Sequence, residues 1–233
     1  MVEQMAINWG YVVILFILGV FTYKRKSLDF IGSLIMVIMG IVLIFAAGPN
    51  WLLLLILFFI LCLIASRYSK DYKLKIGQYE KTRSAKNVIS NGVVAFFMAA
   101  FGGYYLAFAA GFVGAIATAS ADTLASEIGV LYEPRLVTTW QKVPSGTDGA
   151  VSLIGTAVAI TGAAIIGIAS WILGIISNPL IALAVGVIAG TVGCFMDSFL
   201  GAVLERREIL TNEHVNLIAT ITGAIVGILL IGF

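Results

Sequence analysis

Residues 119–147 read ASADTLASEIGVLYEPRLVTTWQKVPSGT, and this stretch indicates both the fold and the place of function. Its first half continues an apolar segment of membrane-spanning length, yet it contains Asp122 and Glu127. A carboxylate within a spanning helix costs roughly 2.5–3.5 kcal/mol on insertion, and such residues by default mark functional sites. The second half supplies Arg135, Lys142 and a Ser-Gly-Thr turn at 145–147, which are groups that bind phosphate. Acidic residues at the membrane boundary, followed by basic residues in the next loop, predict that a charged ligand binds at this boundary.

The composition around this stretch sets the class of protein. Hydrophobic residues make up 61% of the chain and charged residues only 11%, with several apolar runs of spanning length. These values predict an all-α, polytopic membrane protein, because the runs lack the ten-residue alternation of a membrane barrel. Cys62 and Cys194 lie inside apolar segments and are interpreted as small core residues rather than a disulfide or metal pair. No nucleic-acid partner is expected.

The order of apolar runs predicts eight transmembrane helices in a single integral membrane domain, 1–233. Short turns separate them, such as Gly48-Pro49-Asn50 and Ser177-Asn178-Pro179. Residues 1–80 hold three spans without distinctive motifs, and 83–216 hold the motifs discussed below. The predicted spans are 5–23, 28–47, 51–66, 88–103, 104–128, 151–175, 179–203 and 214–232.

The distribution of positive charge predicts the orientation. If eight spans alternate, the loops after spans one, three, five and seven share one side of the membrane. Those four loops contain all 14 Lys and Arg residues. By the positive-inside rule that side is cytoplasmic, and both termini are non-cytoplasmic. The expected location is the cell membrane if the source is prokaryotic, with the active site facing the cytoplasm.

This topology predicts that polar residues of four spans meet in one layer. Asp122 lies six residues before the cytoplasmic end of its span, about 9 Å deep at a rise of ~1.5 Å per residue. Asp197 lies at the same depth in span seven. Asn91, Asn212 and Asn216 lie near the cytoplasmic starts of spans four and eight. Because the outer halves of these spans are almost wholly apolar, the site should open to the cytoplasm and end blind.

The acids of this layer predict a Mg²⁺ site. One ion could take Asp122 and Asp197 from two helices, with phosphate oxygens and water completing its shell. Glu127 is five positions after Asp122, about 140° around the helix, so it joins only if the helix end unwinds near Gly129 or if it serves a second ion. The alternative is a carboxyl pair that shares a proton and only fixes helix packing.

The 130–150 loop predicts an anion site beside the acids. Arg135 can hold phosphate in a bidentate fork, and Lys142 adds a point charge. Ser145, Gly146 and Thr147 lead into span six, whose amino end is itself an anion site because of its free N–H groups. Ordinary capping by Thr147 or Asp148 explains the turn equally well, but it does not explain Arg135 and Lys142.

The basic stretch at 67–86 has a different interpretation. Seven of the chain's Lys and Arg residues lie there. Most of the stretch is predicted to be a solvated face that touches anionic lipid. Only its end, with Lys81, Arg83 and Lys86 leading to Asn87 and Asn91, is close enough to the predicted site to take part.

These motifs resemble the family of transmembrane protein 19 and the plant phytyl-phosphate kinases. The resemblance keeps the same order over residues 83–216, and the string at 121–129 is its most specific part. One departure is Asp148-Gly149-Ala150, where the family usually has Asn-Gly-Gly; the extra acid bears on nucleotide choice or supplies another metal ligand. The matching segments are RSAKNV (83–88), ADTLASEIG (121–129), PRLVTT (134–139), VPSGTDG (143–149), VS (151–152), DSFLGA (197–202) and NEHVN (212–216).

The resemblance implies a membrane kinase that converts a prenyl alcohol monophosphate, such as phytyl or geranylgeranyl phosphate, to its diphosphate. CTP is the favoured donor among nucleoside triphosphates, and membrane lipids surround the site. In this interpretation Asp122, Glu127 and Asp197 hold Mg²⁺ and, with Arg135, form the catalytic set. The groups that bind or orient the two phosphate ends are Arg83, Lys86, Asn91, Arg135, Lys142, Ser145, Gly146, Thr147, Asn212 and Asn216.

Two other functions fit the same residues. A cytidylyltransferase would use CTP and a lipid phosphate to form a CDP-lipid, with the same metal and basic groups. A transporter would use the buried acids as a proton or cation relay. Against transport, the outer half offers no polar path and no repeat of half-sites is visible. The sequence is compatible with a homo-oligomer and does not define the oligomeric state.

Overall fold

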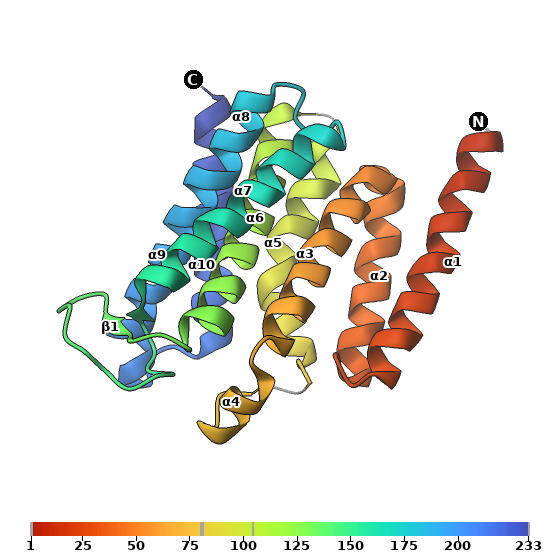
Figure 1. Cartoon of the computed structure of the whole chain (residues 1–233). Coiled ribbons are helices and arrows are strands. Elements are labelled where there is room, and N and C mark those ends of the chain that lie inside the picture. Colours follow the sequence, from red (N-terminus) through yellow and green to blue (C-terminus); the bar gives the residue numbers. More distant parts are fainter. Residues whose placement is uncertain (1, 80–81, 104, 233) are drawn as a thin grey trace.

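The computed structural model describes residues 2–79, 82–103 and 105–232 of the 233, with residues 2–7 described by their backbone alone. The described chain is a bundle of helices with one short two-stranded ladder (Figure 1). The apolar helices of the bundle are α1 (Val2–Lys24), α2 (Phe30–Ala46), α3 (Pro49–Arg67), α5 (Ala85–Gly102), α6 (Leu106–Gly129), α7 (Leu153–Ile172), α9 (Gly190–Val203, continuing from α8, Pro179–Ala184) and α10 (Asn212–Ile231).

The prediction of an all-α polytopic membrane protein is confirmed. Six helical segments of the described chain are long and apolar enough to cross a membrane, and two shorter apolar helices, Asn8–Lys24 and Phe30–Ala46, precede them. Helix ends follow local signals that the sequence contains. Asp29 caps α2 by accepting a hydrogen bond from Gly32 N at 2.6 Å, and Pro49 occupies the first turn of α3.

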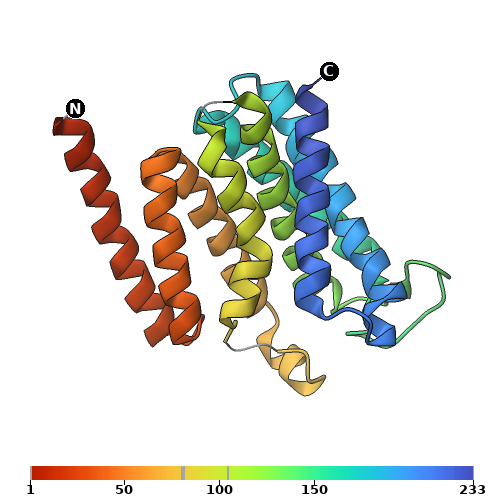
Figure 2. The same ribbon diagram turned by 180° about the vertical axis from the view of Figure 1, so that it is seen from behind.

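Both ends of the chain lie at one end of the bundle, and the charged loops lie at the other. Figure 1 shows the N- and C-termini at the top, with the short helix α4 (Lys70–Lys75) and the 130–150 loop at the bottom. Figure 2 shows α1 standing apart from the main bundle, with α2 between them. Both termini lie at the same end when the chain crosses the bundle an even number of times, as a chain with eight spans does. We call the lower end the loop end.

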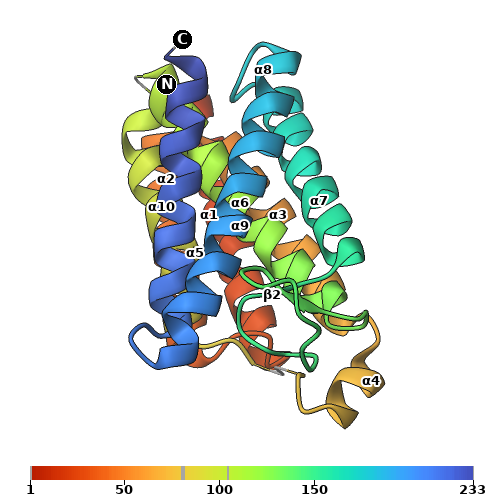
Figure 3. The same ribbon diagram turned by 90° about the vertical axis from the view of Figure 1, so that its left-hand side faces the viewer.

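Helix α6 forms the core of the bundle. In its most apolar window 78% of the residues are buried, against 28–39% in the other spanning segments. Its neighbours approach closely because small residues line the contacts. A Cβ added to Gly114 would collide with the carbonyl of Gly223 in α10, and one added to Gly193 in α9 would collide with the side chain of Thr118. Figure 3 shows α6 behind α9 and α10. This packing holds the helices that bear polar residues next to one another.

The seventh predicted span, 179–203, is not one regular helix. A π-helical segment, η1 (Val185–Ala189), separates α8 from α9. The side chain of Thr118 in α6 donates a hydrogen bond to the carbonyl of Ala189 at 3.2 Å, so the irregular turn is tied to the core. A π segment contains an extra residue in its turn and changes which face the following residues occupy. Hydropathy carries no signal for such a turn, so the sequence could not predict it.

The 130–150 loop folds back across the loop end. Strands β1 (Arg135–Leu136) and β2 (Ala150–Val151) pair antiparallel, with Arg135 opposite Val151 and Leu136 opposite Ala150. Gly149 precedes β2 with a φ of 71°, and a Cβ there would collide with Ala202 at the end of α9. A glycine is therefore required for the loop to rest on α9.

Candidate functional site

A polar cavity of about 360 Å³ opens at the loop end of the bundle. Its walls come from α5, α6, α7, α9, α10 and the 130–150 loop. The following sequence-predicted site residues line it: Arg83, Asn91, Asp122, Glu127, Gly146, Thr147, Asp197, Asn212 and Asn216. The cavity therefore brings together Asn91, Asp122, Asp197, Asn212 and Asn216, as the depth argument predicted.

Asp122 of α6 and Asp197 of α9 form the acidic part of the cavity. Their carboxyl groups lie within hydrogen-bonding reach of each other. Oδ2 of Asp197 is buried and has no hydrogen-bond partner among the described residues. Two adjacent carboxylates repel each other, and both remain ionised only when a cation lies with them; otherwise they share a proton. Oδ2 of Asp197 is thus left to interact with a cation or a ligand group in the cavity.

Glu127 does not join this pair, which corrects its prediction as a ligand of the same metal. Its Oε2 accepts a hydrogen bond from Nζ of Lys73 at 2.8 Å. Its Oε1 accepts from Oγ of Ser66 at 2.7 Å and from Nη2 of Arg83 at 3.2 Å. The physical reason is that two cations already neutralise this carboxylate. Within the described residues, no group of three His, Cys, Asp or Glu side chains that could hold a metal occurs.

Lys73 corrects the interpretation of the 67–86 stretch as a solvated face. This residue of α4 is fully buried, with an exposed fraction of 0%. Besides Glu127, its ammonium group donates to the carbonyls of Ala65 at 2.9 Å and Ser66 at 2.8 Å. All three donors are thus used, as a buried ammonium group requires. No local sequence pattern indicated the burial of Lys73, because its partners lie in other elements.

Arg83 is the one cationic side chain among the described residues that line the polar cavity. Its backbone is fixed to the turn between α1 and α2, since Arg83 N donates to Ser27 O at 3.0 Å and Asp29 N donates to Arg83 O at 3.1 Å. Its Nη2 also donates to Oγ of Ser66 at 3.2 Å. Its Nη1 and Nε make no hydrogen bond to any residue in the described ranges, so they remain available to an anion in the cavity.

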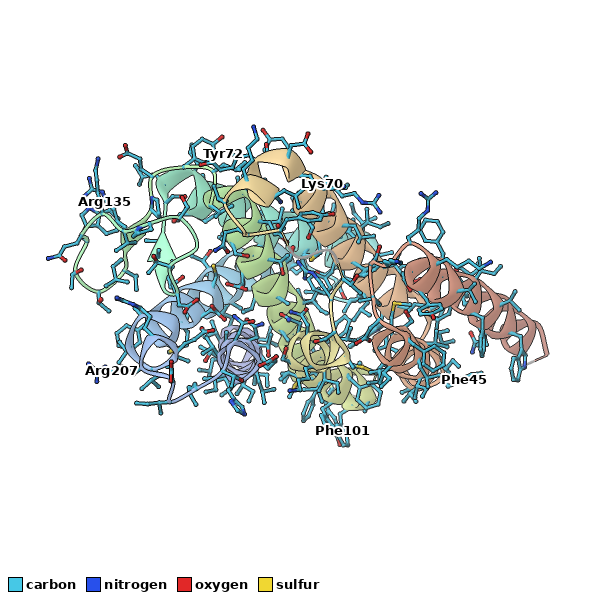
Figure 4. All side chains as sticks on the ribbon, turned by 90° about the horizontal axis from the view of Figure 1, so that it is seen from below. Phe45, Lys70, Tyr72, Phe101, Arg135 and Arg207 are labelled. Carbon is cyan, nitrogen blue, oxygen red and sulfur yellow. The ribbon has the colours of Figure 1, made fainter. Side chains whose placement is uncertain are left out.

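Four other predicted phosphate-binding residues do not line the cavity. Nη1 of Arg135 donates to the carbonyl of Trp140 at 3.0 Å, and its guanidinium lies 6.0 Å from the centre of that indole ring. Figure 4, which views the loop end, shows Arg135 at the edge of the molecule. Lys142 forms an exposed ion pair with Glu133 at 2.6 Å and lowers the pKa of that carboxyl. The clamp predicted on Arg135 and Lys142 is therefore not formed in this structure.

Lys86 and Ser145 also lie outside the cavity lining. Lys86 is exposed in the first turn of α5. Ser145 precedes the two turn residues, Gly146 and Thr147, that do reach the cavity. The side chain of Thr147 donates to the carbonyl of Pro144 at 2.7 Å and closes the turn. Thr147 is therefore a turn residue and does not cap the following helix.

The amino end of α7 opens on the cavity, as predicted, but it begins later than the sequence indicated. Ser152 is the cap, and its Oγ accepts a hydrogen bond from Gly155 N at 3.1 Å. Ser152, Gly155 and Thr156 line the cavity. The remaining free N–H groups of this first turn give that wall a positive potential.

Lys81, the first residue of the basic run that leads to the site, lies outside the described residues. Asn87, the next-to-last residue of that run, lines the cavity one helical turn before Asn91, a spacing that places both on one face of α5. Two further lining residues were not among the predicted site residues. Glu205 and Asp148 extend the acidic wall beside Asp197, whereas the sequence had indicated Asp148 as a possible helix cap and as a departure from the family pattern. Glu205 follows α9 in a short loop where two acidic residues flank two basic ones, so the direction of its side chain could not be predicted.

The fold and the cavity together define a multi-pass helical membrane protein with a carboxylate-bearing polar cavity at one end of its bundle. The chain belongs to the family described as integral membrane protein DUF92, which matches residues 13–224. That range contains all the residues that line the cavity.

Individual relatives support this assignment. An uncharacterized membrane protein of Methanocaldococcus jannaschii is 38% identical over 94% of this chain and 92% of its own length. Protein VTE6 of Arabidopsis thaliana, a chloroplastic protein, is 32% identical over 79% of this chain and 60% of its own. Protein PGR of the same plant is 27% identical over 79% of this chain and 74% of its own. These matches confirm the resemblance to the family of transmembrane protein 19 and the phytyl-phosphate kinases. No solved structure gives a significant match.

Proposed function

We propose that this protein is a Mg²⁺-dependent kinase that phosphorylates a prenyl monophosphate to the diphosphate, with CTP as the favoured nucleoside triphosphate. The observation that carries the proposal is the polar cavity, which combines a paired carboxylate site with one arginine inside a membrane bundle. The family resemblance implies the same activity. In the cell, the loop end would face the cytoplasm, where nucleotides are available.

The donor set of the cavity fits Mg²⁺. This ion prefers oxygen ligands and is commonly held by one or two carboxylates together with substrate phosphates and water. Asp122 and Asp197 supply the carboxylates, and the unpartnered Oδ2 of Asp197 is an oxygen still to be satisfied. When bound, the ion would neutralise charge on the transferring phosphoryl group. Asp148 and Glu205 add negative charge to the same wall and favour a cation there.

Arg83 is the residue best placed to bind the acceptor monophosphate. Glu127 and Ser66 fix its Nη2, which orients the planar guanidinium while Nη1 and Nε remain free to donate. Fixing a side chain before the ligand arrives lowers the entropic cost of binding. Asn87 and Asn91 lie beside it on α5 and can donate through their amides.

The nucleotide would occupy the opposite wall, where backbone groups predominate. The turn at Gly146 and Thr147 and the amino end of α7 present N–H groups to the cavity. An oxygen of the lipid phosphate then forms a bond to the γ-phosphorus, and the bond from that phosphorus to the β–γ bridging oxygen breaks. The products are the lipid diphosphate and the nucleoside diphosphate. The acceptor is already ionised, so the step requires no general base.

The assay that tests this function uses γ-labelled CTP with geranylgeranyl phosphate and Mg²⁺. A kinase transfers the label to the lipid product and leaves CDP. Label in pyrophosphate would identify a cytidylyltransferase instead. Intact CTP, repeated with other nucleoside triphosphates and with phytyl phosphate, would contradict the proposal and favour transport.

Arg83→Lys should reduce phosphoryl transfer about ten- to a hundredfold, chiefly through a higher KM for the prenyl phosphate. Lysine keeps the charge but cannot reproduce the planar fork, and losing one charged hydrogen bond costs roughly 1.5–3 kcal/mol. The matched control is Arg135→Lys, which lies outside the cavity and should change kcat/KM by less than about twofold, the scale of a surface substitution. A larger effect at Arg135 than at Arg83 would contradict the assignment and restore the loop as the phosphate clamp.

The proposed orientation can be tested by cysteine accessibility in intact cells. Single cysteines at positions 75, 142 and 207 should label only from the cytoplasmic side, and one at 177 only from outside. All four positions are exposed, whereas the native Cys62 and Cys194 are buried and should contribute little background. Labelling of position 142 from outside would place the cavity on the wrong face for cytoplasmic nucleotide.

A further inference from the structure

A second cavity, of about 200 Å³, lies beside the polar one. The two cavities share three lining residues, Arg83, Asn87 and Asn91. The end of the second cavity is therefore the wall of the polar cavity that carries the arginine. A ligand could extend from one into the other past the guanidinium of Arg83.

Away from this shared end, the second cavity is lined by apolar side chains of α1, α2, α3 and α5. Among the described lining residues, Thr22 is the hydroxyl-bearing exception, and it donates to the carbonyl of Gly19 at 2.9 Å. Along α3 the lining runs from Leu52 to Leu63, about 16 Å at a rise of ~1.5 Å per residue. Met36 and Met39 contribute from α2, and methionine side chains adapt readily to different apolar shapes.

We propose that this cavity, which we call the chain cavity, holds the isoprenoid chain of the acceptor. The phosphate would lie at Arg83, and the chain would run along α3 away from the acidic pair. This inference rests on the proposed function, and it identifies the chain cavity as the part of the protein that determines lipid selectivity. A ligand with one anionic end and one apolar tail matches the charge at the shared end and the apolar walls behind it.

The proposal also predicts how chain length is selected. Each additional isoprene unit buries more apolar surface until the chain reaches the Leu52 end of the lining along α3. Affinity should rise from dimethylallyl to geranyl to farnesyl phosphate and then level off. The acyl chain of a membrane phospholipid is the alternative occupant, and the first experiment distinguishes it.

That experiment is photo-crosslinking of the purified full chain with a farnesyl phosphate analogue that carries a diazirine in its tail. Adducts should map to α1, α2 and α3 residues of the chain cavity, and geranylgeranyl phosphate should compete for them. Adducts on outward-facing residues such as Phe97 would overturn the proposal. Equal competition by a phospholipid would also overturn it, because the cavity would then be a general lipid site.

A pair of matched substitutions on α3 gives the second experiment. Ile56→Trp places bulk in the chain cavity, and Ile64→Trp makes the same change on an exposed face of the same helix. Ile56→Trp should raise the KM for geranylgeranyl phosphate by about tenfold while leaving that for dimethylallyl phosphate within about twofold. Ile64→Trp should change neither. Equal losses for both substrates in the Ile56 variant would contradict a chain-binding role.

The two experiments also separate this inference from the proposed function. Adducts in the chain cavity without phosphoryl transfer from any nucleotide would retain the lipid site and reject the kinase. Phosphoryl transfer with adducts elsewhere would retain the kinase and reject the chain cavity.

Discussion

Asp122→Asn and Asp197→Asn are each expected to lower phosphoryl transfer by about a hundredfold or more while leaving the bundle folded. Asparagine keeps the size of the side chain and an oxygen acceptor, but it lacks the charge that a divalent cation requires. Because the two carboxyl groups lie side by side, each substitution also removes a repulsive contact. Thermal stability in detergent should therefore be unchanged or slightly higher.

The control for this result is Asp71→Asn, the same substitution at an exposed position of α4. It should leave turnover unchanged. A second measurement separates a metal site from a packing pair: Mg²⁺ should raise the thermal midpoint of the wild-type protein, since a ligand that binds the folded state stabilises it, and should not do so in either variant. Near-normal turnover of both variants at saturating Mg²⁺ would mean that the acids only hold the helices together.

Lys73→Met is expected to cause the largest loss of stability of any substitution in the basic stretch. Removing one member of a buried ion pair costs about 3–5 kcal/mol, and the lower end applies here because Arg83 remains bound to Glu127. The change also leaves the carbonyls of Ala65 and Ser66 without their donor. Hydrogen exchange across α4 and the end of α3, with the thermal midpoint in detergent, measures the effect.

Lys75→Met provides the matched control, since Lys75 lies two positions further along α4 and is exposed. It should shift the thermal midpoint very little. Adding Glu127→Gln to Lys73→Met should recover part of the lost stability, because the side chain at position 127 then carries no charge that has lost its Lys73 partner. If both lysine variants behave alike, the buried network does not anchor α4.

The sequence predicted the helices well because membrane spans are set by length and hydropathy. The predicted span 28–47 corresponds to Phe30–Ala46, and 51–66 to Pro49–Arg67. The meeting of Asp122 with Asp197 could also be predicted, because depth follows from counting residues to the end of each span. The side of the bundle that a helix face meets cannot be found by counting residues. The partners of Glu127 could therefore be identified only from the structure.

Partner choice was the part that could not be predicted. Lys73 and Arg135 are both basic residues in loop segments, yet one is buried against Glu127 and the other lies at the surface against Trp140. Whether each of these side chains is buried depends on contacts with distant parts of the chain rather than on the residues next to it in the sequence. The basic group of the site therefore came from the end of the 67–86 stretch, at Arg83, and not from the 130–150 loop.

The π-helical segment at Val185–Ala189 has a consequence for how relatives should be compared. In a regular helix each residue turns the chain by about 100°, so one residue more or less upstream of Asp197 swings its carboxyl group to another side of α9. The pairing with Asp122 thus depends on chain length as well as residue identity. Relatives that lack one residue here would conserve the aspartate in an alignment and still present it to lipid. An insertion or deletion in this turn would therefore move the aspartate to another side of α9 without changing the aligned residue itself.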